Sequence, residues 1–173
     1  MKKTGLLVCL FVGFAVSAFA LGGQAPQGLP ETGRPAIDFK LPDLSGRTIS
    51  LSGHKGKVIF LNFFATWCPP CREEMPSMQA LYNKLKGRDF EMLAVSIDRD
   101  AAKLKAFVEK NKYTFRILSD PDGTVASQYG VGAIQATFII DKKGRIAGSF
   151  VGGRDWTERS VLEMLTRLMK EER

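Results

Sequence analysis

Histidine and cysteine are scarce in this sequence, which has one histidine and three cysteines among its 173 residues. Cys9 belongs to an apolar N-terminal segment, so Cys68 and Cys71 are the two thiols of the remaining chain. Two cysteines do not complete the four-ligand set of a zinc ion. The single histidine, His54, falls in a polar turn and is interpreted as a solvated loop residue. We therefore expect neither a metal site nor a bound cofactor.

Long blocks of like charge are also missing. The formal net charge is +7, but Lys2 and Lys3 lie in the N-terminal segment, and setting these two aside leaves 23 of the 25 basic residues against 18 acidic ones. The basic residues are dispersed, and aromatic residues do not alternate with them. A nucleic-acid-binding surface needs a basic stripe or patch, so we expect no nucleic-acid partner.

The first 35 residues differ in composition from the rest. Residues 1–20 combine two lysines, an apolar run of about 15 residues and the ending Ala-Phe-Ala, which is the pattern of a secretory signal peptide. We expect cleavage after Ala20 and a periplasmic location. The alternative is an uncleaved membrane anchor, for which the run is short. Residues 21–35 are rich in Gly, Pro and Gln and are predicted to form a flexible leader before one domain at 36–173.

Strand and helix signals alternate from residue 36 to the C-terminus. Their order, β-β-β-α-β-α-β-α-β-β-α, indicates a layered α/β domain with crossovers between the early strands. The segment 57–65 is almost unbroken apolar sequence, as expected of a central strand buried on both faces. The other predicted elements are strands at 37–41, 48–51, 90–97, 115–118, 137–141 and 145–151, and helices at 69–85, 100–111 and ending near Tyr129.

A final amphipathic helix closes the chain. Its apolar residues recur at helical spacing and include Leu162 and Leu165. Asp155 and Glu158 precede it and are spaced like a capping pair at a helix start.

The sequence TWCPPCR directly follows the central strand and begins the first helix. Cys68 falls at the helix start, where free backbone N–H groups and the helix dipole favour a thiolate. A thiolate is the attacking species in disulfide exchange, and Cys71, one turn later, is placed to attack the resulting mixed disulfide. We predict a working redox pair. A permanent structural disulfide is the alternative, but such a short loop gains little chain entropy.

The two residues between the cysteines are expected to modulate this chemistry. Pro69 and Pro70 suit the first helical turn, but neither has an N–H group to offer the Cys68 sulfur. The N–H of Cys71 remains. Our hypothesis is that the Cys68 thiolate is stabilised less than in pairs with histidine or glycine between the cysteines. Such a pair favours the disulfide, which makes the reduced protein the better electron donor.

Three segments together resemble the TlpA/ResA-like branch of the thioredoxin superfamily: DFKLPDLSGRTISL, VIFLNFFATWCPPCREEMP and YGVGAIQATFIIDKKGRI. The resemblance runs from about residue 36 to the C-terminus. It implies a thioredoxin-like α/β fold, with a central mixed sheet flanked by helices and an N-terminal β-hairpin extension. Peroxiredoxins share the first segment, but their reactive cysteine lies in a Thr-x-x-Cys setting, whereas Thr66 is two residues before Cys68.

The resemblance also implies an activity and partners. Members of this branch are exported thiol–disulfide oxidoreductases that often reduce the cysteines of apocytochrome c before haem attachment. They are commonly recharged by a membrane-embedded thiol donor. We therefore expect cysteine-containing exported proteins as partners.

Individual residues are carried over from the branch. Asn62 stands where ordinary thioredoxins have a buried acid, with a hydrogen-bonded core amide as the plain alternative. Glu74 matches the acidic residue of the branch, and partial burial is expected to raise its pKa towards that of a useful base. Glu73 and Glu74 as mere complements of the positive helix end are the alternative. Pro76 matches the helix proline of the superfamily. Trp67 is expected either to shield the cysteines or simply to pack.

One position departs from the pattern. The superfamily has a cis-proline just before the strand that faces the active cysteine, and here that place is occupied by Gln135. A cis bond before a residue other than proline costs about 2.5–4 kcal/mol, so we predict a trans Ile134–Gln135 bond. The loop that pairs with a partner backbone is then altered. Gln135 is placed to present its amide to the thiol or to open the site to a metal.

The resulting prediction is an exported disulfide reductase with Cys68, Cys71 and Glu74 as its catalytic residues. Trp67, Pro70, Asn62 and Gln135 are expected to support them. Two alternatives are a peroxide-reducing thiol enzyme and a non-enzymatic metal or copper-delivery module. The Cys-x-x-Cys spacing and the lack of any histidine after it count against metal delivery.

Overall fold

The structure is a computed structural model that describes residues 29–132 and 134–172. The predicted signal peptide and most of the predicted leader lie outside the described residues. Within them, no helix is long and apolar enough to cross a membrane. The elements are β1 (Lys40–Pro42), β2 (Thr48–Ser50), η1 (Ser52–His54), β3 (Val58–Phe64), α1 (Pro69–Leu85), β4 (Phe90–Ser96), α2 (Ala101–Asn111), β5 (Arg116–Ser119), α3 (Thr124–Gln128), β6 (Ala136–Ile140), β7 (Ile146–Val151) and α4 (Arg159–Lys170).

A mixed sheet forms the centre of the domain. Its five strands lie in the order β5-β4-β3-β6-β7, with β3, β4 and β5 parallel and with β6 and β7 antiparallel to their neighbours. The short strands β1 and β2 form a separate antiparallel hairpin before the sheet. This arrangement confirms the predicted mixed sheet and the N-terminal hairpin.

The middle strand β3 positions the candidate site. All seven of its residues are buried, as its unbroken apolar sequence predicts. Its carboxyl end leads through a short turn into α1, so the two cysteines lie where the central strand ends. Asn62 is the polar residue of β3, and it pairs with Thr137 of β6 in the sheet register.

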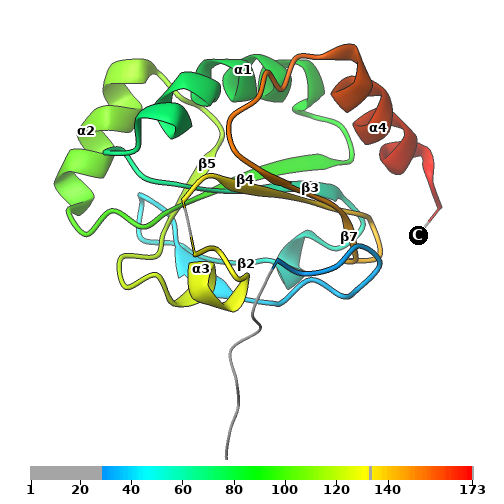
Figure 1. The fold of residues 1–173 in the computed structure, drawn as a ribbon, viewed down its shortest axis with the longest axis horizontal. Helices are drawn as coiled ribbons and strands as arrows, with labels where there is room; N and C mark the ends of the chain where they lie inside the picture. Colours follow the sequence, from blue (N-terminus) through cyan, green and yellow to red (C-terminus); the bar gives the residue numbers. More distant parts are fainter. Residues whose placement is uncertain (1–28, 133, 173) are drawn as a thin grey trace, which may run out of the picture.

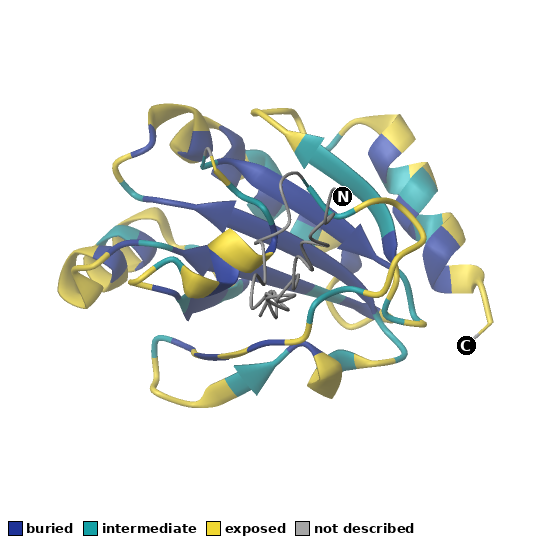
Figure 2. Cartoon of the chain, turned by 60° about the horizontal axis from the view of Figure 1, so that its bottom comes forward, coloured by how far each residue is buried: buried dark blue, intermediate teal, exposed yellow. Residues whose placement is uncertain are grey.

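Helices cover the sheet on both faces (Figure 1). The helices α1, α2 and α4 lie on one face, and α3 lies with the β1–β2 hairpin on the other. The strands β3, β4 and β6 are almost entirely buried and the edge strand β7 is mostly intermediate, whereas the helices show buried and exposed faces in alternation (Figure 2). Tyr129, just after α3, donates a hydrogen bond of 2.7 Å to the carbonyl of Ile37 and so fastens the segment before β1.

Two local predictions are wrong. Glu158 is the N-cap of α4, but its side chain caps nothing, and the Asp155 carboxylate accepts hydrogen bonds from the backbone and hydroxyl of Thr157 in the preceding turn. The pair therefore builds a turn and does not form a capping box. His54 is also less solvated than predicted, because its Nδ1 lies 3.0 Å from the Ser50 carbonyl and its side chain is mostly covered.

The orientation of α4 on the sheet can be tested by substituting leucines on its apolar face. Leu165 is completely buried, whereas Leu162, on the same predicted apolar stripe, is only partly buried. We expect Leu165→Ala to lower the free energy of unfolding by about 3 kcal/mol, since it leaves a cavity in a packed layer. Leu162→Ala, the matched control, is expected to cost about 1 kcal/mol or less. Chemical denaturation measures both, and equal losses would contradict the described orientation of α4.

Candidate active site

The two cysteines form a disulfide at the start of α1. Cys68 is the N-cap, and its Sγ accepts a hydrogen bond from the Cys71 backbone N–H at 3.3 Å. Pro69 and Pro70 fill the first helical positions, so the Cys71 N–H is the donor that the sequence left available. Cys68 keeps 7% of its surface exposed, whereas Cys71 is completely buried. A partner sulfur therefore reaches Cys68 first, and Cys71 is shielded.

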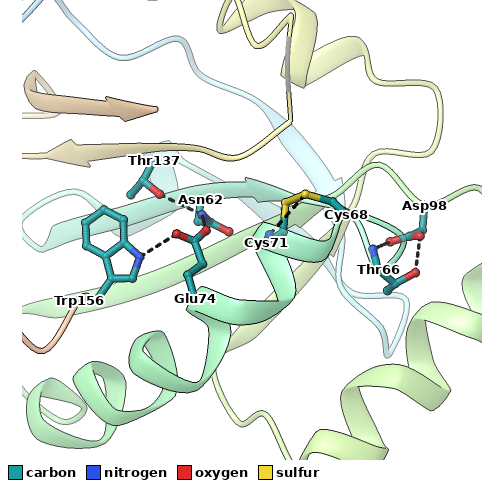
Figure 3. Close-up of a disulfide and its surroundings, with 8 residues drawn as sticks. All are labelled: Asn62, Thr66, Cys68, Cys71, Glu74, Asp98, Thr137 and Trp156. Carbon is teal, nitrogen blue, oxygen red and sulfur yellow. Dashed lines mark hydrogen bonds between the residues drawn. A yellow bond between two sulfur atoms is a disulfide. The ribbon is translucent and has the colours of Figure 1, made fainter. Parts of the chain in front are cut away.

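A buried carboxylate lies on the Cys71 side of the disulfide (Figure 3). Glu74 is 4% exposed and accepts two hydrogen bonds of 3.1 Å, from Asn62 Nδ2 to Oε1 and from Trp156 Nε1 to Oε2. Asn62 Nδ2 also donates to Thr137 Oγ1 at 2.9 Å. Burial raises the pKa of the Glu74 carboxyl above its ordinary value, and the hydrogen bonds from Trp156 and Asn62 oppose this effect without cancelling it.

The burial of Glu74 agrees with the environment predicted for a base, and its role as a base stays a prediction. A residue that merely complements the helix dipole stays at the surface, as the exposed Glu73 does. Glu74 points instead into the layer between α1, β3 and the segment before α4. Its neighbour Trp156 packs edge-on against Phe60, with ring centroids 4.6 Å apart. The sequence analysis did not identify Trp156, although a buried indole needs a partner for its N–H group.

A second buried carboxylate lies on the Cys68 side (Figure 3). Asp98 accepts hydrogen bonds from the backbone N–H and the hydroxyl of Thr66, at 2.9 and 2.6 Å, and from the Ser96 hydroxyl at 2.6 Å. Thr66 belongs to the turn that carries Cys68, whose N–H donates to the Ala65 carbonyl. Asp98 therefore fixes the turn. The sequence analysis missed it, because an aspartate after a strand carries no distinctive signal.

The exposed side of Cys68 opens into an apolar cleft of about 470 Å³. Trp67 forms one wall of this cleft and is 63% exposed. The opposite walls come from α3 and from the loops before β6. The apolar lining residues besides Trp67 and Pro69 are Ile97, Ala126, Val131 and Ile134.

Residues 32–149 match the AhpC/TSA family. The thiol-disulfide oxidoreductase ResA of Geobacillus kaustophilus is 41% identical over 162 residues, covering 88% of this chain and 87% of that protein. ResA of Bacillus thuringiensis is 34% identical, covering 94% of this chain and 91% of that protein. The chain belongs to the TlpA/ResA-like branch of the thioredoxin superfamily.

Solved structures agree with this placement. A DsbE-type thiol:disulfide interchange protein from Chlorobium tepidum has a TM-score of 0.75 at 30% identity, covering 82% of this chain and 99% of that one. A secreted thiol-disulfide isomerase from Corynebacterium glutamicum has a TM-score of 0.70 at 27% identity, covering 78% and 85%. The protein is thus a thiol-disulfide oxidoreductase of thioredoxin-like fold.

Gln135 gives this enzyme an unusual backbone. The peptide bond before it is trans, as predicted, but its φ is +87°, a left-handed value that a residue other than glycine adopts at a cost of about 1–3 kcal/mol. Its side chain is 5% exposed, and its Nε2 has no hydrogen-bond partner. Proline, which fixes φ near −65°, does not fit this backbone.

The strain at Gln135 yields a stability prediction. Gln135→Gly is expected to raise the free energy of unfolding by up to about 1 kcal/mol, because glycine adopts positive φ freely and brings no unpartnered amide. Gln135→Pro, which restores the residue of the superfamily, is expected to lower it by about 2 kcal/mol or more. Thermal and chemical unfolding measure both. A stabilising proline together with a destabilising glycine would contradict the described backbone.

The raised pKa of Glu74 yields a second prediction. Between the value in the unfolded chain, about 4.3, and the higher value in the native protein, the native state holds a proton that the unfolded state has released. Stability is therefore lost as the pH rises through this interval. We expect the free energy of unfolding of the wild type, relative to Glu74→Gln, to fall with rising pH.

Chemical denaturation over a pH series measures this dependence. Glu73→Gln, at the exposed neighbouring position, is the matched control and is expected to follow the wild type. Parallel curves for the wild type and Glu74→Gln would show that burial does not perturb this carboxyl.

Proposed function

We propose that this enzyme is exported and reduces disulfides in partner proteins, with Cys68 as the nucleophile and Cys71 as the resolving thiol. The observation that carries the proposal is the unequal placement of the two sulfurs. Cys68 lies at the edge of an apolar cleft, and Cys71 lies completely buried beside the carboxylate of Glu74. A permanent structural disulfide has no need of either feature.

The reaction proceeds in two exchanges. The Cys68 thiolate of the reduced enzyme attacks one sulfur of a partner disulfide, which forms a mixed disulfide and releases the other partner sulfur as a thiolate. Glu74 then takes the proton of Cys71. The Cys71 thiolate attacks Cys68 Sγ, which forms the Cys68–Cys71 disulfide and releases the second partner thiolate. Two electrons have passed to the partner, and a thiol donor must return them.

Supporting roles follow from the contacts at the site. Asn62 and Trp156 hold Glu74 beside Cys71, and Asp98 holds the turn that carries Cys68. Trp67 forms the exposed wall against which an apolar segment of a partner lies. Pro70 withholds an N–H group from the Cys68 sulfur, which disfavours the thiolate and makes the enzyme an electron donor.

The location and the partners belong to the same proposal. The signal-like pattern of residues 1–20 supports export to the periplasm, as does the similarity to a secreted thiol-disulfide isomerase. The family resemblance supports apocytochrome c as a partner and a membrane-embedded thiol donor as the source of electrons. The apolar cleft suits an unfolded or extended cysteine-containing segment of this kind.

Trapping tests the proposal directly. Cys71→Ala removes the resolving thiol, so we expect Cys68 to remain covalently bound to its partner in extracts of the exported fraction. The adducts are identified by mass spectrometry after release with a reductant. Cys68→Ala is the matched control and is expected to trap nothing, because it lacks the exposed sulfur.

Purified components separate the alternatives. The reduced wild type is expected to reduce a peptide disulfide of apocytochrome type much faster than it reacts with hydrogen peroxide. The opposite order of rates would favour a peroxide-reducing enzyme. A reduction potential of about −120 mV, the value of a strong disulfide-forming enzyme, would contradict the proposed flow of electrons from the enzyme to its partner.

A further inference from the structure

Gln135 has a feature that the two exchanges leave unexplained. Its Nε2 is buried without a hydrogen-bond partner. Asn62 Oδ1 is another such atom among the described side chains, and Asn62 contacts Glu74 through its Nδ2. A spare donor on Gln135 and a spare acceptor on Asn62 are thus left in the interior. Buried polar groups are normally paired, so an unpartnered donor beside a redox pair is a candidate for a role that appears during the reaction.

The surroundings of Gln135 place its amide beside the first turn of α1. A Cβ atom on Gly153 would lie 2.8 Å from Gln135 Nε2 and 3.7 Å from the carbonyl oxygen of Pro70. Because glycine has no Cβ atom, Gly153 leaves room for the Gln135 amide. The neighbouring Gly152 N–H donates to the Gln135 carbonyl at 3.0 Å, which ties the loop after β7 to the start of β6.

Glu74 is the acceptor within reach of this amide. The Gln135 side chain is among the groups that lower the pKa of Glu74, together with Trp156, Asn62 and the Arg154 backbone. In the disulfide state this contact does not meet the geometry of an ordinary hydrogen bond, and Gln135 Nε2 has no partner of that kind.

We propose that Gln135 is a positioning residue whose amide donates a hydrogen bond to the Glu74 carboxylate in the reduced enzyme. The amide keeps the carboxylate ionised, and so able to take the proton of Cys71. This inference rests on the role of Glu74 in the proposed function. It goes further in assigning a purpose to the residue that replaces the proline of the superfamily.

The physical reason lies in the competition between burial and donors. Burial favours the protonated form of the Glu74 carboxyl, which accepts no proton from Cys71. A base works best when its pKa lies near the working pH. Each N–H donor to Glu74 lowers the pKa of its carboxyl and so offsets part of the effect of burial. A protonated oxygen meets the amide N–H as one donor facing another, whereas the ionised carboxylate accepts it.

The groups that face Glu74 come from several elements. On α1 this is Cys71, and β3 contributes the neutral Asn62. The segment before α4 contributes Trp156 and Arg154, whose guanidinium lies over the Phe150 ring, 4.4 Å from its centroid. Substitution of the neutral Gln135 therefore changes the surroundings of Glu74 without changing a charge.

The resolving step can be measured by itself. Reduced enzyme is mixed with one equivalent of 2,2′-dithiodipyridine. The first thiopyridone released reports attack by Cys68, and the second reports attack by Cys71 on the mixed disulfide. Stopped-flow absorbance over roughly pH 5–9 gives the pH profile of the second release.

Gln135→Met keeps the side-chain length and the positive φ but removes the donor, and Gln135→Gly removes both the donor and the strain. In both variants we expect the midpoint on the acid side of the pH profile of the second release to move to higher pH. At a pH below the wild-type midpoint, the rate is expected to fall about threefold to tenfold, since one pKa unit corresponds to a tenfold change in the ionised fraction on the acid side. Gln128→Met, the same change on the exposed end of α3, is expected to retain the wild-type profile.

A double-mutant cycle distinguishes this role from a merely structural one. In the Glu74→Gln background, Gln135→Met is expected to leave the second release unchanged, because the acceptor of the proposed hydrogen bond is altered. An equal effect of Gln135→Met in both backgrounds would overturn the proposal, as would unchanged midpoints in both Gln135 variants. If the wild type itself gave no second release, the proposed function would fail, and the Gln135 proposal with it.

Discussion

The burial of one carboxylate beside a reactive disulfide constrains most of this structure. Taking the ionised form of Glu74 out of water is costly unless hydrogen bonds compensate it. Trp156 and Asn62 supply those bonds, so the start of α1, the centre of β3 and the segment before α4 must meet at one place. The edge-on contact of Trp156 with Phe60 then fixes how the C-terminal part packs over the sheet. Glu74 and the C-terminal part of the fold are thus held by the same contacts.

Two carboxylates lie on opposite sides of the disulfide and make different contacts (Figure 3). Asp98 bonds the turn that presents Cys68 to the apolar cleft, and its role is geometric. Glu74 lies behind Cys71, where its raised pKa suits proton exchange with a buried thiol. The exposure of Cys68 and the few donors that the proline pair leaves for its sulfur support the proposed direction of electron flow, from the enzyme to its partner.

The sequence predicted the elements well, because their signals are local. The unbroken apolar run became β3, and the proline start and spaced apolar residues became α1 over the predicted range. Contacts between distant segments left no such signal. The Glu74–Trp156 bond joins residues 82 positions apart, and the Thr66–Asp98 bonds join residues 32 positions apart. The departure at Gln135 was visible as a missing proline. Its positive φ was not, since a side chain reveals nothing of the backbone that its neighbours impose on it.

The most direct test of the account is the titration of Glu74 itself. Carbon-13 labelling of the glutamate side chains, with Glu74→Gln to assign the signal, allows its carboxyl to be followed by NMR in the disulfide and dithiol states. The account predicts a midpoint above the ordinary glutamate value of about 4.3 in the disulfide state, and a different midpoint after reduction because Cys71 then titrates beside it. A midpoint at or below the ordinary value, unchanged by reduction, would contradict the claim that a buried carboxylate serves the redox pair.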